Sequence, residues 1–372
     1  MTDARTPIDK LTYVPYQKAV EQLRPDEPES IKKMIDSLLK NNERAFHKYR
    51  HAIRDAHAKS HGILFGELRV HPDLAVHLRQ GIFAEPGRTY PVVARLSTTS
   101  GAIRSDQVRG VRGMGLKVIG VTGERVEPKF PEPNQDFVLV TEPEFPFKDA
   151  LDYSNAGMLT ATALSYAPDP ALRVLNTVLH GANRLLKLLG TELPLKLRVF
   201  AGENTQTLGI SFYTAAPIRF GKYIAKLSVT PSSPSVTALE GKTVAGGTEA
   251  HTEAVVDFFK NNSAEYLVSA QLCTSLTQMP IEDASKRWPE DLSPYQPVAT
   301  ISYPRQDPYS PERRIFGDDR LTFNSWRAIV EHQPLGSINR LKKEVYEASS
   351  TFRHRMNSVE RLEPGSTADL PA

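Results

Sequence analysis

The sequence contains very little cysteine. Cys273 is the only cysteine among its 372 residues. A single thiol excludes an intramolecular disulfide, disfavours a zinc site built on thiolates and leaves one candidate thiolate for iron. Because Cys273 follows the strand-like run Ala270-Gln271-Leu272, we expect it to be a small core residue and not an iron ligand.

Long apolar runs and a strong net charge are also absent. No stretch approaches the roughly 18 apolar residues that a membrane span needs, so we expect no transmembrane segment. Residues 1–5 lead into mixed charges instead of the apolar segment of a secretory signal, which favours a cytoplasmic protein. The 46 Lys and Arg residues against 43 Asp and Glu give a formal charge of +3, dispersed along the chain, which argues against a nucleic-acid partner.

The length of the chain permits one large core that encloses a cofactor. Residues 1–29 are polar and contain four prolines, and we expect them to form an extended N-terminal arm. One main domain follows over 30–356, and residues 357–372 are expected to form a polar C-terminal tail.

Apolar residues at helical spacing predict three long helices. The first runs from Ser30 to near His57, and the others cover 171–189 and 335–356. Apolar runs bounded by Gly and Pro predict strands between them. These strands lie at 63–70, 92–96, 114–119, 137–140, 209–213, 224–229, 266–272 and 298–303. Because the elements lack regular βαβ alternation, the predicted fold class is α+β.

Two clusters place charged and polar side chains near predicted strands. Arg54 and His57 lie where the first helix is expected to give way to a strand, a position where catalytic groups often occur. Arg95 and Ser97 are two residues apart on a strand and share a face, where a buried arginine needs an anionic partner. Taken alone, His57 also fits a structural role, and Arg95 fits an ordinary half-exposed position.

A third cluster, Arg109-Gly110-Val111-Arg112-Gly113-Met114-Gly115-Leu116-Lys117-Val118, is rich in glycine. Its glycines do not fall in the order of a dinucleotide-binding loop, and the segment leads into a strand and not into a helix. We therefore expect these glycines to allow tight backbone packing.

A fourth cluster flanks the predicted strand 137–140. Asn134 precedes this strand, where an amide can donate a hydrogen bond to a bound oxygen species or can cap a turn. Phe145 and Pro146 follow the strand.

The last predicted helix carries the fifth cluster, with Lys342, Tyr346 and Arg353 along one face. A basic residue one turn before a tyrosine favours the phenolate, as a tyrosine that binds iron requires. Without further context, Tyr346 equally fits a core aromatic.

In this order, the five clusters resemble the motifs of the haem catalases and of shorter catalase-related proteins, which include peroxidases and enzymes that convert fatty-acid hydroperoxides. Arg54-x-x-His57 resembles the family's Arg-x-x-His, and Val93-Ala94-Arg95-Leu96-Ser97 resembles its Val-Arg-Phe-Ser strand. Residues 112–117 are similar to Arg-Gly-Phe-Ala-Val-Lys. Lys342-x-x-x-Tyr346 stands where the family has Arg-x-x-x-Tyr.

The resemblance covers most of the chain, from about Arg54 to Met356, and is looser between 147 and 334. The segment Met279-Pro280-Ile281-Glu282-Asp283-Ala284, with Trp288 after it, is similar to a stretch of the short catalase-like proteins. The chain is therefore expected to be one of these short members, and a homo-oligomer is possible.

The resemblance implies a fold and a cofactor. The fold is a closed antiparallel β-barrel with surrounding helices, and haem b lies between the barrel and the C-terminal helix. Tyr346 corresponds to the iron ligand, His57 to the distal acid–base group and Ser97 to the residue that orients the histidine. Asn134 corresponds to a distal amide, with Gln135 as the alternative.

The resemblance also assigns contacts to the haem periphery. Arg54, Arg95 and Arg353 correspond to arginines that hold the propionates, with Arg355 as a rival to Arg353. Phe145 corresponds to a phenylalanine near the haem edge. Lys342 departs from the family's arginine, and its point charge without a planar fork implies a phenolate that is held less firmly.

The function implied is a haem peroxidase or catalase-type enzyme that acts on hydrogen peroxide or organic hydroperoxides. One alternative is a fatty-acid hydroperoxide isomerase or lyase, similar to allene oxide synthase, which needs a long apolar channel. Ala56 mildly favours peroxidase or catalase chemistry, because some members specialised for fatty-acid hydroperoxides carry a hydroxyl residue before the histidine. Two further alternatives are a non-catalytic haem-binding protein and a relic in which Lys342 has abolished haem binding.

Overall fold

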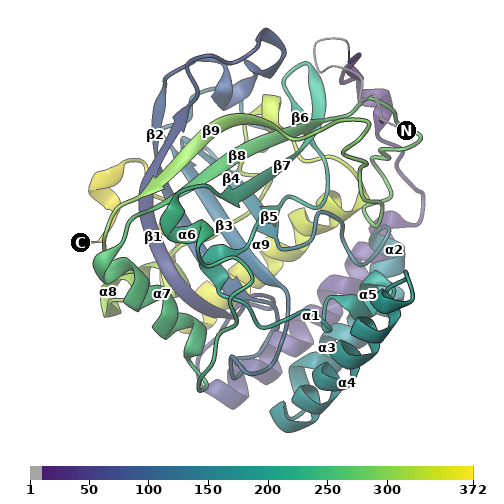
Figure 1. Cartoon of the computed structure of the whole chain (residues 1–372), viewed down its shortest axis with the longest axis vertical. Helices are drawn as coiled ribbons and strands as arrows, with labels where there is room; N and C mark the ends of the chain where they lie inside the picture. Colours follow the sequence, from purple (N-terminus) through teal and green to yellow (C-terminus); the bar gives the residue numbers. More distant parts are fainter. Residues whose placement is uncertain (1–10, 372) are drawn as a thin grey trace.

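A computed structural model describes residues 11–371, and it describes residues 163–165 by their backbone alone. Within this range the chain forms one nine-stranded antiparallel sheet (Figure 1). Its strands are β1 Lys59–Val70, β2 Thr89–Thr98, β3 Arg112–Ile119, β4 Asn134–Val140, β5 Phe212–Tyr213, β6 Ile218–Phe220, β7 Tyr223–Pro231, β8 Ala264–Leu272 and β9 Gln296–Tyr303.

The sheet closes into a barrel of eight strands. Its order is β5-β4-β3-β2-β1-β9-β8-β7, and β5 closes the ring because it pairs with both β4 and β7. The ninth strand, β6, adds to β7 outside the ring. The closed antiparallel β-barrel with surrounding helices expected from the resemblance is confirmed.

The interior of the barrel holds the main hydrophobic core. Val92, Ala94 and Leu96 of β2 belong to this core, as alternation along a strand requires. The intervening residues Arg95 and Ser97 point to the outer face of the barrel, toward the helices. Alternate residues of β2 therefore fill the core, and the residues between them present polar side chains outside it.

Helices cover the outside of the barrel, and α1 to α5 gather on one side of it (Figure 1). They are α1 Glu27–Tyr49, α2 Ala150–Asp152, α3 Met158–Tyr166, α4 Asp169–Leu188, α5 Leu195–Arg198, α6 Pro234–Thr237, α7 Ala250–Asn261, α8 Pro311–Arg314 and α9 Ser337–Asn357. A second hydrophobic cluster joins α1 to α9 through Met34, Leu38, Leu341 and Val345. In the part of the chain that the structure describes, none of the helices has the length and apolarity to cross a bilayer.

The helices predicted at 171–189 and 335–356 are confirmed as α4 and α9. The first predicted helix is too long, because α1 ends at Tyr49 and not near His57. Arg50 ends it by adopting a left-handed conformation with φ 55°, and its N–H bonds to the Phe46 carbonyl. His57 therefore lies in the loop before β1. The predicted strand 209–213 shortens to β5, and β6 and α7 were not predicted.

The residues after α9 pack back onto the barrel. The side chain of Glu363 is 3% exposed and pairs with Lys117 on β3 at 2.8 Å. Leu362 and Leu370 lie against a small hydrophobic cluster beside β1 and β2. This segment is thus tied to the body of the protein, although the sequence suggested a polar tail.

Residues 1–10 of the predicted N-terminal arm lie outside the described residues. The division of the chain at residues 29 and 356 remains a prediction.

Candidate active site

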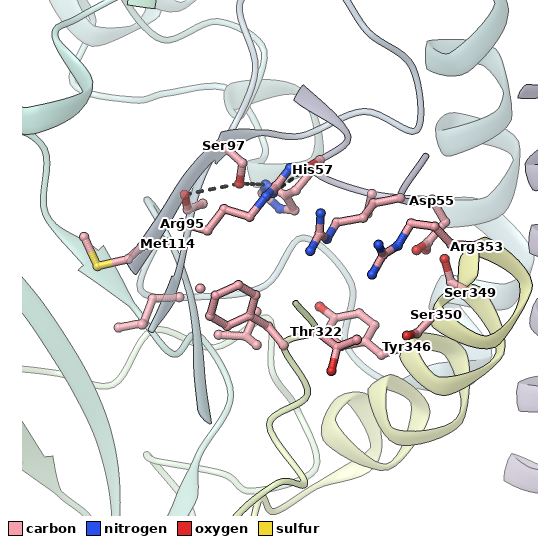
Figure 2. A pocket seen from close by; sticks show the side chains of 17 residues that line it. Asp55, His57, Arg95, Ser97, Met114, Thr322, Tyr346, Ser349, Ser350 and Arg353 are labelled. Carbon is pink, nitrogen blue, oxygen red and sulfur yellow. Dashed lines mark hydrogen bonds between the residues drawn. The ribbon is translucent and has the colours of Figure 1, made fainter. Parts of the chain in front are cut away.

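A cavity of about 670 Å³ lies between β2, β3, the loop before β1, and α9 (Figure 2). We call it the arginine pocket. It brings together six residues that the sequence singled out: Arg54, His57, Arg95, Ser97, Tyr346 and Arg353. His57 projects from the barrel side and Tyr346 from α9 on the other side (Figure 2). Residues almost 300 positions apart in the chain thus face one pocket.

The imidazole of His57 is held at both ring nitrogens. Ser97 Oγ donates to the Gly113 carbonyl at 3.3 Å, so it accepts from His57 Nδ1 at 3.2 Å. This network assigns the proton to Nδ1 and leaves the lone pair on Nε2, where the Thr99 hydroxyl donates at 3.0 Å. Burial, and then the positive charges of Arg95 and Lys342, lower the pKa of His57 to about 3. The ring is therefore neutral and has a basic Nε2.

Gly113 and Thr99 complete the surroundings of this ring. A Cβ atom at Gly113 would come within 2.5 Å of the imidazole, so the glycine is required for the close approach. This confirms the tight packing expected of the glycine-rich cluster. Sequence reasoning missed Thr99, although its spacing offered a signal. Arg95, Ser97 and Thr99 alternate along β2 and its end, so they share a face.

Three buried or partly buried arginines converge on one turn of π-helix, Ile315–Arg320. Arg54 and Arg353 donate to the Asp318 carbonyl at 2.9 and 2.7 Å. Arg95 pairs with the Asp318 carboxylate at 2.9 Å and also bonds to the His57 carbonyl. Sequence reasoning missed Asp318, because no local pattern links it to residues more than 200 positions away.

The arginines repel one another. Burial, and then the charges of Arg95 and Arg353, lower the pKa of Arg54 well below its ordinary value. Burial, and then the charge of Arg95, lower the pKa of Arg353 to about 10. The three guanidiniums lie near the carboxylates of Asp318 and Asp319, and Asp55 also lines the pocket. Such a cluster of guanidiniums suits an anionic ligand.

Arg353 and its rival Arg355 differ in burial. Arg353 is 2% exposed and lines the pocket, whereas Arg355 is exposed and lies against the ring of Phe352. At 3.6 residues per turn, two positions along α9 rotate a side chain about 200° away.

Tyr346 presents its phenol to the pocket as an uncharged group. Burial, and then the neighbouring carboxylate of Asp55, raise the pKa of Tyr346. In the described range 11–371, the hydroxyl of Tyr346 takes part in none of the hydrogen bonds of the structure, and its side chain lines the pocket. A phenol that faces a cavity without a protein partner is available to a ligand placed there.

Lys342 lines the apolar side of the site together with Tyr346. Its Nζ lies 5.4 Å from the ring centroid of Phe145, and among the described residues no hydrogen bond joins it to Tyr346. Burial lowers the pKa of Lys342 to about 8. Its charge acts on His57, whose pKa it lowers. The expectation that Lys342 favours the Tyr346 phenolate is therefore not supported by the structure.

Asn134 lies outside the pocket, contrary to expectation. It occupies the first position of β4, paired with Ile119, while Val138 and Leu139 are the residues of β4 that line the pocket. Four residues of strand separate Asn134 from Val138 by roughly 13 Å. Gln135, the alternative, is also occupied elsewhere, since its amide bonds to the backbone of Asp136 and Ile329. β4 thus contributes an apolar wall and no amide.

A second, larger cavity of about 1510 Å³ adjoins the arginine pocket. We call it the apolar cavity. It shares His57 and Tyr346 with the pocket and extends to Met158 on α3 and Phe200 after α5. Its walls are mostly apolar and include Met34, Leu38, Val140, Phe145, Leu341 and Val345. Phe145 and Lys342 therefore belong to this cavity, next to the polar groups and not among them.

A family model described as Catalase matches residues 14–158. The barrel also superposes on the barrels of solved catalases. Over residues 14–158 the chain is similar to the catalase family. Its match to the family model includes Arg54, His57, Arg95 and Ser97 and ends well before α9. The position of Tyr346 therefore depends on the fold and on the sequence resemblance.

Solved structures show how far the likeness to catalases extends. A fungal catalase has a TM-score of 0.56 at 16% identity, over 95% of this chain and 70% of that chain. Catalase A from Saccharomyces cerevisiae has a TM-score of 0.56 at 17% identity, over 95% and 72%. A bacterial catalase has a TM-score of 0.54 at 16% identity, over 84% and 59%. No curated protein sequence matches the chain.

Proposed function

We propose that this protein is a haem-dependent enzyme that reacts with hydroperoxides. The family match and the fold support an oxidoreductase of peroxide chemistry in general, because catalases as a family bind haem and act on peroxides. The observation that carries the proposal is the shared pocket. A neutral histidine with a basic Nε2 and a phenol without a protein partner line one cavity ringed by three arginines.

The chemistry of the pocket fits haem b. Tyr346 would bind the iron through its phenol oxygen, and iron attracts the phenolate despite the raised pKa of the free side chain. Arg54, Arg95 and Arg353 would hold the propionates, whose negative charge relieves the repulsion among the guanidiniums. The haem would supply the iron at which the O–O bond of a peroxide is cleaved.

His57 would move the proton of the hydroperoxide. Its Nε2 accepts that proton, while the Nδ1–H bond to Ser97 keeps the ring oriented. The Thr99 hydroxyl must then release Nε2, since it now donates there. The protonated ring returns the proton to the departing oxygen. Such acid–base catalysis contributes a factor of about 10²–10⁴ to the rate.

The apolar cavity favours a second candidate, the rearrangement of a lipid hydroperoxide by an isomerase or lyase. The cavity reaches from His57 to Phe200, farther than a small peroxide needs. An acyl chain could lie in it with its hydroperoxide beside His57. Both candidates use the same pocket and differ in the product.

Reconstitution with hemin tests the cofactor. We expect a Soret band with high-spin ferric features, lost or strongly shifted in Tyr346→Phe. Tyr153→Phe is the matched control, because Tyr153 is a nearby phenol that also lines the apolar cavity and whose pKa burial raises to about 12. A wild-type protein that binds no hemin, or a Tyr346→Phe spectrum like that of wild type, would overturn the proposal.

Product analysis separates the candidates. Hydrogen peroxide and a fatty-acid hydroperoxide are reacted side by side with the reconstituted protein, and oxygen release, donor oxidation and rearranged lipid are measured. Donor oxidation or oxygen release supports the peroxidase, and rearranged lipid without donor consumption supports the isomerase or lyase. Bleaching of the Soret band without any of these products identifies a non-catalytic haem-binding protein.

A further inference from the structure

The outward face of α4 is apolar. Val174, Val178 and Leu185 are 65%, 62% and 61% exposed, and they lie within one narrow stripe at helical spacing. Leu188 and the following Leu189 are exposed too. The apolar stripe that predicted this helix from sequence thus lies in part on the surface. A soluble protein rarely leaves such a continuous aliphatic stripe uncovered.

The inward face of α4 is partly polar. Asn176 is buried and bonds to the Phe200 carbonyl and to the Arg109 amide, and buried Asn183 accepts from the Leu193 amide. These bonds anchor the helix by its asparagines. The helix is therefore oriented so that the stripe of Val174, Val178 and Leu185 remains outside, while Leu172 is buried on the same side as the asparagines.

Positive charge flanks the exposed stripe. At 100° per residue, Arg173, Arg184 and Lys187 fall on one arc of α4, between the buried asparagines and the aliphatic stripe. Asp169 is the acidic residue of this helix, and it pairs with Arg104 at its first turn. An aliphatic stripe with a cationic flank is typical of helices that lie in the interface of an anionic membrane.

The apolar cavity ends beneath this helix. Phe200, whose carbonyl accepts the bond from Asn176, lines the cavity together with Val199. Met158 and Ala161 of α3, the helix that precedes α4, line it from the other side. The exposed aliphatic face and part of the wall of the cavity are thus built from adjacent elements.

We propose that α4 is a docking face for an anionic lipid membrane, in which Val174, Val178 and Leu185 enter the acyl region and the basic flank meets the lipid headgroups. A second copy of the chain fits this face less well, because a symmetric contact would bring the same positive charges together. On this arrangement the cavity receives apolar hydroperoxides from the bilayer. That last step rests on the proposed function, whereas docking does not.

Vesicle co-sedimentation tests the docking. Full-length protein is mixed with phosphatidylcholine vesicles with and without phosphatidylglycerol, at low and at physiological ionic strength. We expect binding to the anionic vesicles that weakens with salt. Val178→Gln with Leu185→Gln should reduce the partition coefficient at least about a hundredfold. Arg184→Gln with Lys187→Gln should reduce it roughly thirtyfold on anionic vesicles.

Leu23→Gln with Val76→Gln is the matched control, because these side chains are 74% and 77% exposed at other places on the surface. This control should bind as wild type does. Circular dichroism checks that every variant is folded, and light scattering follows the oligomeric state. Absence of wild-type binding, unchanged binding by the α4 variants, or a dimer that the α4 substitutions dissociate without any vesicle binding would each overturn the proposal. Because no peroxide or haem signal is read, docking and the proposed function can fail separately.

Discussion

The ring of His57 occupies the space that a side chain on Gly113 would fill. The imidazole approaches this position so closely that a Cβ atom would lie 2.5 Å from its Cε1 and Nδ1. Because Ser97 bonds both to the Gly113 carbonyl and to the ring, the glycine and the hydroxyl together define where the ring lies.

Gly113→Ala should therefore impair the reaction with peroxide without removing the cofactor. The added methyl group pushes the ring away from Ser97, and we expect the rate to fall by about 10²–10⁴ while the Soret band remains. Gly181→Ala is the control, since a Cβ atom there meets nothing within 4 Å. A Gly113→Ala protein with the wild-type rate would contradict the assigned role of His57.

The pH profile of the peroxide reaction should lack the inflection of an ordinary histidine. The pKa of His57 is lowered to about 3, so the basic form persists as the pH falls through 6.5. We expect kcat/KM to be flat between about pH 5 and 8. An inflection near 6.5 that disappears in His57→Gln would show that the ring is protonated far more easily than its burial and cationic neighbours imply.

Arg353 and Arg355 should differ in their effect on hemin affinity. Arg353→Gln removes a charge-assisted contact worth about 1.5–3 kcal/mol, which corresponds to a loss of about 10–100-fold in affinity. Arg355→Gln should leave the affinity unchanged, because its side chain is exposed. Hemin titration measures both, and Arg353→Lys tests whether the charge alone suffices. Equal losses of hemin affinity in the two glutamine variants would contradict the assignment of Arg353 as a residue that holds a propionate.

A buried ion network under the pocket should contribute to stability. Asp136 pairs with Lys117 at 2.6 Å and with Arg327 at 2.8 Å, and all three side chains are almost fully buried. Asp136→Ala leaves the two buried cations with Glu363 and, for Arg327, with Glu132 at 3.7 Å, and we expect the free energy of unfolding to fall by about 3–5 kcal/mol.

Urea denaturation measures this loss. The control is Asp257→Ala, which breaks the exposed pair with Lys260 and should leave the free energy of unfolding nearly unchanged. A similar small cost for Asp136→Ala would mean that water or relaxation compensates the buried charges.

Local patterns in the sequence determined most of the elements. The period of two along β2 placed Arg95 and Ser97 on one face, and the period of 3.6 along α9 placed Tyr346 and Arg353 on another. Both elements formed as predicted because apolar periodicity reflects which side of an element is buried. The motif resemblance supplied the barrel, which pairings between distant strands then confirmed.

Tertiary structure decided where side chains meet. Asn134 has the right chemistry for a distal amide but lies at the wrong end of β4, and the spacing of one strand cannot reveal this. Asp318 gathers arginines from three distant segments, including Arg54 at 264 positions away. Contacts of such sequence separation leave no local signature.

The two sides of α4 also show that sequence patterns do not decide which side of a helix is buried. Its aliphatic residues at helical spacing, among them Val174 and Leu185, predicted the helix, and such a stripe ordinarily faces a core. Only the packed structure shows that Asn176 and Asn183 take the inner position and leave the stripe outside. The sequence identifies which residues are hydrophobic, whereas the packing of neighbouring helices and strands decides which of these residues are buried.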